Sequence, residues 1–160
     1  MASWSELTAA APDLAARAKA AFDRSKHKTM ATLRKDGSPR ISGTEVDFRN
    51  GEAWLGSMPR AVKAQDLQRD PRVAVHSASA EPDEEAGKMD PDAKLSGRAV
   101  EITDPDVVAE FAADAPPGGM HLFRLDITEL AVTGVEGTPP YLYIDYWTEA
   151  AGEVKRVKRD

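Results

Sequence analysis

The sequence predicts a mainly β protein, an antiparallel barrel or sandwich with a few short helices at its ends. From Lys28 onward, short segments rich in Thr, Val and Ile alternate with turn-forming residues, a texture typical of antiparallel strands. Hairpin signals at Asp36-Gly37 and Asn50-Gly51 join the first three of these segments. A length of 160 residues fits one domain, 1–160, around one hydrophobic core.

The first half of the chain is expected to form two helices around a three-stranded meander. An Ala-rich segment with apolar residues at helical spacing predicts an N-terminal helix over about 12–24, with Pro12 at the favourable first position. The predicted strands are 29–34, a long strand 40–48 and a brief one at 53–55. A second helix is expected after Gly56, capped by Ser57 and ending before Pro71.

The second half is expected to consist mainly of strands. They are predicted at 72–77, 94–102, about 121–135, 141–148 and 154–158, with a short helix after Asp104-Pro105. Residues 80–92 are acidic and lack an apolar period, which indicates a solvated loop. The total is seven or eight strands.

Composition excludes several classes of function. A formal charge of −6 argues against a dedicated nucleic-acid binder, because such proteins need a positive field to neutralise phosphates. With no cysteine, zinc-thiolate sites, iron–sulfur clusters and thiol nucleophiles are excluded. No apolar run is long enough to span a membrane and no leader is visible, so we expect a cytoplasmic protein.

The most informative segment for function is the expected strand, turn and helix start at 54–63. The first turn of a helix offers unpaired N–H groups and a partial positive charge, so anions bind there readily. Ser57 is placed to cap the helix and to donate its hydroxyl to an anion. Arg60 and Lys63 are expected on one helical face, where they add a forked donor and a point charge. A plain cap and solvated surface cations are the alternative interpretation.

The same segment lies within a longer resemblance. The sequence resembles the pyridoxamine 5′-phosphate oxidase-like FMN-binding split-barrel superfamily, and is most similar to its flavin and deazaflavin (F420) oxidoreductase branch. The resemblance covers about residues 13–135 and is carried by Ala31-Thr32-Leu33, Asp36-Gly37-Ser38-Pro39-Arg40, Trp54-Leu55-Gly56-Ser57, Arg60-Ala61-Val62-Lys63 and Asp70-Pro71-Arg72-Val73-Ala74-Val75.

This resemblance implies an antiparallel six- to eight-stranded split β-barrel with peripheral helices. It also implies a homodimer with cofactor sites at the subunit interface, and hydride transfer between FMN or F420 and a small organic substrate. The strand after the first hairpin would line the isoalloxazine, and the next strand end and helix start would hold the phosphate. The implied cofactor-binding residues are Arg40, Ile41, Ser42, Gly43, Thr44, Gly56, Ser57, Arg60 and Lys63. No metal site and no catalytic acid or base is predicted.

Other interpretations remain open. Residues 141–160 carry no equivalent of the Arg-rich signature with which the true pyridoxamine phosphate oxidases hold their substrate, so oxidation of vitamin B6 is not expected. Some split-barrel relatives bind haem, for which His76 or His121 would be the ligand. A flavin- or haem-binding protein without turnover is therefore the alternative function. Glu45 and Asp47 are candidates to contact a ligand hydroxyl, although solvent exposure is the simpler interpretation.

Overall fold

The computed structural model describes residues 1–80, 89–111, 113, 115 and 117–159. Within these residues the chain forms nine strands and four α-helices. The strands are β1 (Lys28–Leu33), β2 (Pro39–Thr44), β3 (Asp47–Arg49), β4 (Glu52–Ser57), β5 (Arg72–His76), β6 (Asp92–Ile102), β7 (His121–Glu136), β8 (Tyr141–Thr148) and β9 (Val154–Arg159). The helices are α1 (Trp4–Ala10), α2 (Pro12–Asp23), α3 (Val62–Arg69) and α4 (Pro105–Ala109).

All of these strands belong to one antiparallel sheet. Its order is β2-β1-β5-β6-β7-β4-β3, and β7 also pairs with β8, which pairs with β9. The predicted antiparallel, mainly β fold with peripheral helices is confirmed. The long strand predicted at 40–48 is divided in two, because Glu45 and Val46 leave the extended ladder between β2 and β3.

Glu45 and Val46 form a two-residue link between the two ends of the sheet. Strands β2 and β3 are adjacent in the chain but lie first and last in the strand order. Three chain steps separate Thr44 from Asp47, and extended chain covers at most about 3.6 Å per residue. The two ends of the sheet therefore lie within roughly 11 Å of each other. The sheet must therefore curl on itself into a barrel, which stays open between β2 and β3 because these two strands do not pair.

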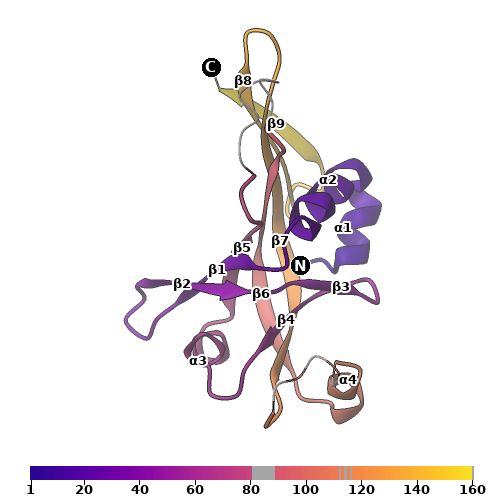
Figure 1. Cartoon of the computed structure of the whole chain (residues 1–160). Helices are drawn as coiled ribbons and strands as arrows, with labels where there is room; N and C mark the ends of the chain where they lie inside the picture. Colours follow the sequence, from indigo (N-terminus) through magenta and orange to yellow (C-terminus); the bar gives the residue numbers. More distant parts are fainter. Residues whose placement is uncertain (81–88, 112, 114, 116, 160) are drawn as a thin grey trace.

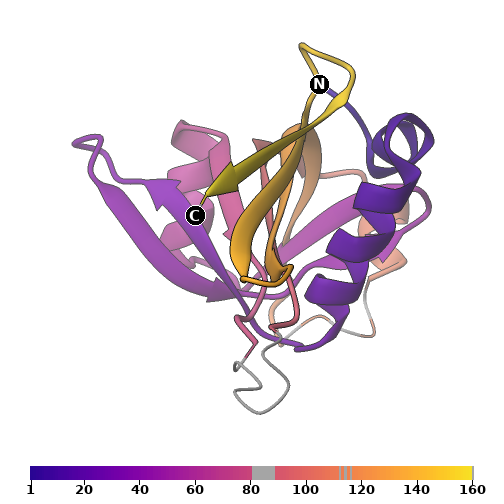
Figure 2. The same cartoon turned by 90° about the horizontal axis from the view of Figure 1, so that it is seen from above.

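The helices cover different parts of this curled sheet. Helices α1 and α2 lie together on one side, whereas α3 and α4 lie at the end of the molecule opposite the β8–β9 hairpin (Figure 1). Figure 2 shows α2 running along the outside of the sheet. Helix α2 buries one face, consisting of Leu14, Ala15, Ala18, Ala21 and Phe22, in the main core.

Helix α1 was not predicted, although the sequence contains its start signal. The Ser3 hydroxyl accepts a hydrogen bond from the Glu6 N–H, and the Glu6 carboxylate accepts one from the Ser3 N–H. This reciprocal pair is a capping box. Trp4 and Leu7 of the helix are buried in the core.

Two further outcomes concern the long strands and loops. The paired strands β6 and β7 contain a register shift at Ser96 and Gly97, where the Gly97 backbone passes close to the Asp126 carbonyl. Most of the acidic loop predicted at 80–92 lies outside the described residues, and Asp92 itself begins β6. No helix in the described part of the chain is long and apolar enough to cross a membrane.

Candidate functional site

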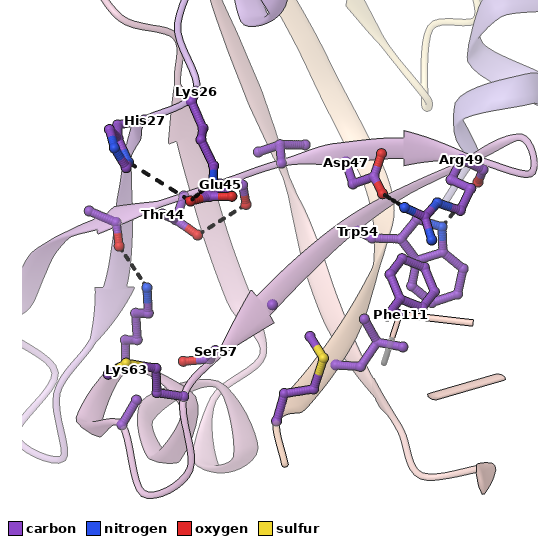
Figure 3. A pocket seen from close by; sticks show the side chains of 17 residues that line it. Lys26, His27, Thr44, Glu45, Asp47, Arg49, Trp54, Ser57, Lys63 and Phe111 are labelled. Carbon is purple, nitrogen blue, oxygen red and sulfur yellow. Dashed lines mark hydrogen bonds and ion pairs between the residues drawn. The ribbon is translucent and has the colours of Figure 1, made fainter. Parts of the chain in front are cut away.

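A cavity of about 640 Å³ lies where β2, β4 and the start of α3 meet the ends of β7 and α4 (Figure 3). A volume of this size suits a cofactor or a drug-sized ligand. Strand β4 supplies one wall, because Trp54 and Gly56 alternate with the core residue Leu55. The cavity has a polar end near Lys63 and an aromatic end near Phe111 (Figure 3).

The polar end holds one cation and one buried hydroxyl. Lys63, in the first turn of α3, donates from Nζ to the Gly43 carbonyl at 2.6 Å. Burial lowers the pKa of the Lys63 ammonium, and the nearby Glu45 partly opposes this shift. Ser57 is 8% exposed, and its Oγ has no hydrogen-bond partner among the described residues. A buried hydroxyl without a partner is uncommon, so this atom indicates that a ligand atom belongs beside it.

The backbone around this end leaves room for a ligand. A Cβ added to Gly43 would meet no atom within 4 Å, so this strand edge faces open space. The α3 N-cap, Ala61, lines the cavity and provides no side-chain hydrogen bond to the first turn. The Ala64 N–H donates to the Ala61 carbonyl, so among the described residues the first-turn N–H groups available to an anion are those of Val62 and Lys63.

A small charged cluster forms the rim above the polar end. Glu45 lies 3.4 Å from Lys26 Nζ and 4.0 Å from His27 Nδ1 (Figure 3). All three side chains are largely exposed. Such exposed pairs contribute little to stability.

The opposite end is built from aromatic side chains. Trp54 and Phe111 pack with ring centroids 5.0 Å apart, and the Arg49 guanidinium lies 4.5 Å from the Phe111 centroid. Arg49 also pairs with Asp47 at 2.8 Å and donates to the Glu110 carbonyl at 3.0 Å. Trp54, Phe111 and Leu122 form a second hydrophobic cluster, separate from the main core.

Five of the nine predicted cofactor residues line this cavity and four do not. Those that line it are Gly43, Thr44, Gly56, Ser57 and Lys63. Arg40 instead pairs with the buried Asp66, and Ile41 is 75% exposed and does not line the cavity. Ser42, the next residue of β2, is partly buried, and Arg60 lies in the turn before α3.

The predicted helix start at Ser57 is wrong. Ser57 is the last residue of β4, and α3 begins five residues later at Val62. Pro59 disfavours the helical conformation at Met58, and Arg60 has a left-handed φ of 61° that cannot continue a right-handed helix. Arg60 and Lys63 therefore do not share a helical face.

Several lining residues were not predicted, including Lys26, His27, Phe111 and Met120. One signal was available for His27. The β1–β2 hairpin pairs Lys28 with Thr44, so continuing the same register by one residue places His27 beside Glu45. Phe111 gives no such signal, because its contact with Trp54 joins distant parts of the chain.

The two histidines considered as haem ligands do not line the cavity, although His121 is the β7 register partner of Ser57. His76 Nδ1 lies 2.6 Å from the Ser77 carbonyl, and His121 Nδ1 lies 2.8 Å from Glu101 Oε1. No group of three metal-ligating side chains occurs among the residues that the structure describes. Only His27, of the three histidines in the sequence, lines the cavity.

The family model for pyridoxamine 5′-phosphate oxidase matches residues 14–137, which is more than half of the chain. The chain belongs to the pyridoxamine 5′-phosphate oxidase family. A comparison with curated proteins gave no match.

Solved structures similar to this family member share its fold at low identity. One is a pyridoxamine 5′-phosphate oxidase-related, FMN-binding protein from Nostoc punctiforme, with 13% identity, a TM-score of 0.58, and coverage of 100% of this chain and 98% of that chain. Another is a heme-binding protein from Mycobacterium smegmatis, with 17% identity, a TM-score of 0.54, and coverage of 89% and 85%.

A third similar structure is a protein of unknown function from Agrobacterium tumefaciens, with 21% identity and a TM-score of 0.55. The match covers 71% of this chain and 55% of that one, so this chain spans little more than half of that relative. The resemblance to the pyridoxamine 5′-phosphate oxidase-like split barrels therefore extends from sequence to fold. The similar proteins include an FMN-binding protein and a heme-binding protein.

Proposed function

We propose that this member of the pyridoxamine 5′-phosphate oxidase family binds FMN in the cavity beside β4 and acts as an oxidoreductase. The observation that carries the proposal is the buried, unpartnered Ser57 hydroxyl at the same end of the cavity as Lys63. A phosphate there would accept hydrogen bonds from Ser57, Lys63 and the first N–H groups of α3. The bound flavin would supply hydride transfer to or from a small organic substrate.

The residues of the chain would then position the cofactor. Lys63 is anchored by the Gly43 carbonyl, so its ammonium needs little reordering to meet a phosphate. The edge of β2 at Gly43 and Thr44 and the wall at Gly56 would face the rest of the cofactor. A homodimer with cofactor sites at the subunit interface, one domain per chain and a cytoplasmic location belong to the same proposal.

Two other cofactors are the alternatives. F420 also carries a phosphate, so the same polar end would hold it. Haem is the second candidate function, favoured by the similarity to the heme-binding protein from Mycobacterium smegmatis. True pyridoxamine phosphate oxidation is not proposed, because Arg156 near the C-terminus is engaged by Asp145 and Glu136.

The test is a titration of cofactor-free protein with FMN, F420 and hemin, followed by flavin or deazaflavin fluorescence and by the Soret band. Lys63→Met should weaken FMN binding about 10- to 100-fold, because one charge-assisted hydrogen bond contributes about 1.5–3 kcal/mol. Ser57→Ala should weaken it about fivefold through the loss of a neutral hydrogen bond of about 1 kcal/mol.

Arg60→Met is the matched control, since Arg60 is a cation three residues from Lys63 that does not line the cavity. It should change FMN affinity by less than about twofold. Equal losses of FMN affinity in Lys63→Met and Arg60→Met would show that FMN binding depends on the overall charge of the protein and not on a contact with Lys63. Tight hemin binding with no FMN or F420 binding would replace the flavin proposal with the haem-binding function.

A further inference from the structure

A second cavity, of about 620 Å³, lies between the β1–β2 turn and α3, and it shares no lining residue with the first. Its charged lining residues are the cations Arg34, Lys35, Arg40 and Arg69 and the acids Asp36 and Asp66. Their formal charge is +2, in a chain whose formal charge is −6. This cavity is therefore a locally positive region on a negatively charged protein, and such a region attracts anions.

Asp66 organises the cations of this cavity. Its carboxylate is 2% exposed and accepts from Arg40 Nε at 2.6 Å, from Arg69 Nη2 at 2.8 Å and from Thr32 Oγ1 at 3.0 Å. Both carboxylate oxygens are used. Asp66 therefore holds two guanidinium groups next to each other while offering little free negative charge to a ligand.

Several donors of this cavity have no protein acceptor among the described residues. Among the described residues, neither terminal nitrogen of Arg40 and no atom of the Lys35 ammonium makes a hydrogen bond or ion pair. Arg69 Nη2 also donates to the Leu33 carbonyl at 2.6 Å, which fixes it beside the hairpin that carries Arg34. Asp36 is occupied by its own turn, since Oδ1 accepts from both the N–H and the hydroxyl of Ser38.

We propose that this cavity is a second anion-binding site, for a small multivalent oxyanion of the phosphate or carboxylate type. Planar guanidinium forks match such oxygens, and two prepositioned forks with a nearby ammonium favour a ligand with more than one charge. This proposal does not depend on the flavin proposal, because the second cavity shares no lining residue with the cavity at Lys63.

The experiment is isothermal titration calorimetry at low ionic strength with pyrophosphate and with citrate, on the full chain. Binding of at least one probe at submillimolar concentration is expected, and the tighter probe identifies the oxyanion class. Arg34→Gln combined with Lys35→Gln should weaken the affinity for that probe at least tenfold. Arg34→Lys combined with Lys35→Arg should keep this affinity within about threefold. FMN affinity should be unchanged in both variants.

The charge control is Lys155→Gln combined with Arg159→Gln, on the exposed strand β9. It removes the same charge far from the cavity and should leave probe binding nearly intact. Equal weakening in this control, absence of binding by either probe, or loss of binding in Lys63→Met alone would each overturn the proposal. A protein that fails to bind FMN yet binds pyrophosphate would contradict only the flavin proposal.

Discussion

Arg156 holds the buried carboxylate of Asp145 through two parallel hydrogen bonds, from Nε to Oδ1 at 2.6 Å and from Nη2 to Oδ2 at 2.7 Å. Arg17 of α2 adds a third contact to Oδ2 at 2.7 Å. The Arg156 guanidinium also lies 4.7 Å from the centroid of the Tyr143 ring. One carboxylate on β8 thus joins β9 and α2, although every residue of β9 is exposed.

Asp145→Ala should lower the free energy of unfolding by about 2–3 kcal/mol. The loss is at the lower end for a buried ion pair, because the two arginines are 35–40% exposed and water can solvate them again. Urea denaturation measures the effect. Asp23→Ala, which removes only the surface pair with Lys19, should change stability by less than about 0.5 kcal/mol. Similar losses in both variants would contradict the special role of Asp145.

Stability should fall in acid through the two buried aspartates. Hydrogen bonds from Arg156 lower the pKa of Asp145 against the opposing effect of burial, with further help from Arg17. For Asp66, burial raises the pKa, but bonds from Arg69, Arg40 and Thr32 outweigh it and the net shift is downward.

A carboxyl whose folded pKa lies below its unfolded value stabilises the protein above the unfolded pKa, and this stabilisation disappears as pH falls through the folded pKa. Unfolding free energies measured across a pH series should therefore decline below about pH 4. Asp145→Asn should start from a lower stability and decline less steeply. An equally steep decline in that variant would show that Asp145 does not contribute.

Gly97→Ala should destabilise the sheet strongly. A Cβ at Gly97 would lie 2.2 Å from the Asp126 carbonyl oxygen, so β6 and β7 would have to separate at their register shift. We expect a loss of about 3 kcal/mol or more, measured as a lower midpoint of thermal unfolding. Gly43→Ala is the matched control, because a Cβ there meets nothing within 4 Å. Destabilisation of the two variants by equal amounts would refute the steric explanation.

Arg49→Ala should loosen the aromatic end of the first cavity without unfolding the sheet. Arg49 connects this end to α4 through the Glu110 carbonyl and the face of Phe111. We expect faster amide exchange across 105–111 and a change in global stability of about 1 kcal/mol or less. Hydrogen exchange followed by mass spectrometry measures the local exchange across 105–111 and, from the slowest-exchanging amides, the global stability. Unchanged exchange in this segment would show that the hydrophobic cluster with Trp54 and Leu122 holds Phe111 without help from Arg49.

Local patterns predicted most of the strands, because alternation and turn residues act over a few positions. The hairpin at Asp36-Gly37 even contains the information that places His27 beside Glu45. The helix start failed because a serine followed by cations resembles a cap, whereas Pro59 and the left-handed Arg60 extend the turn. The role of Arg40 depended on its pairing with Asp66, 26 residues away, and no local pattern carries that contact.

The two residues between β2 and β3 set the width of the opening in the barrel. Thr44, Glu45, Val46 and Asp47 all line the first cavity, so the chain that closes the sheet is also its wall. This link contributes no ladder hydrogen bonds, because Glu45 and Val46 belong to neither strand. Inserting or deleting a residue here would change the cavity wall and the packing of Val46 against the main core together. The room for a ligand and the closure of the sheet thus depend on the same short link.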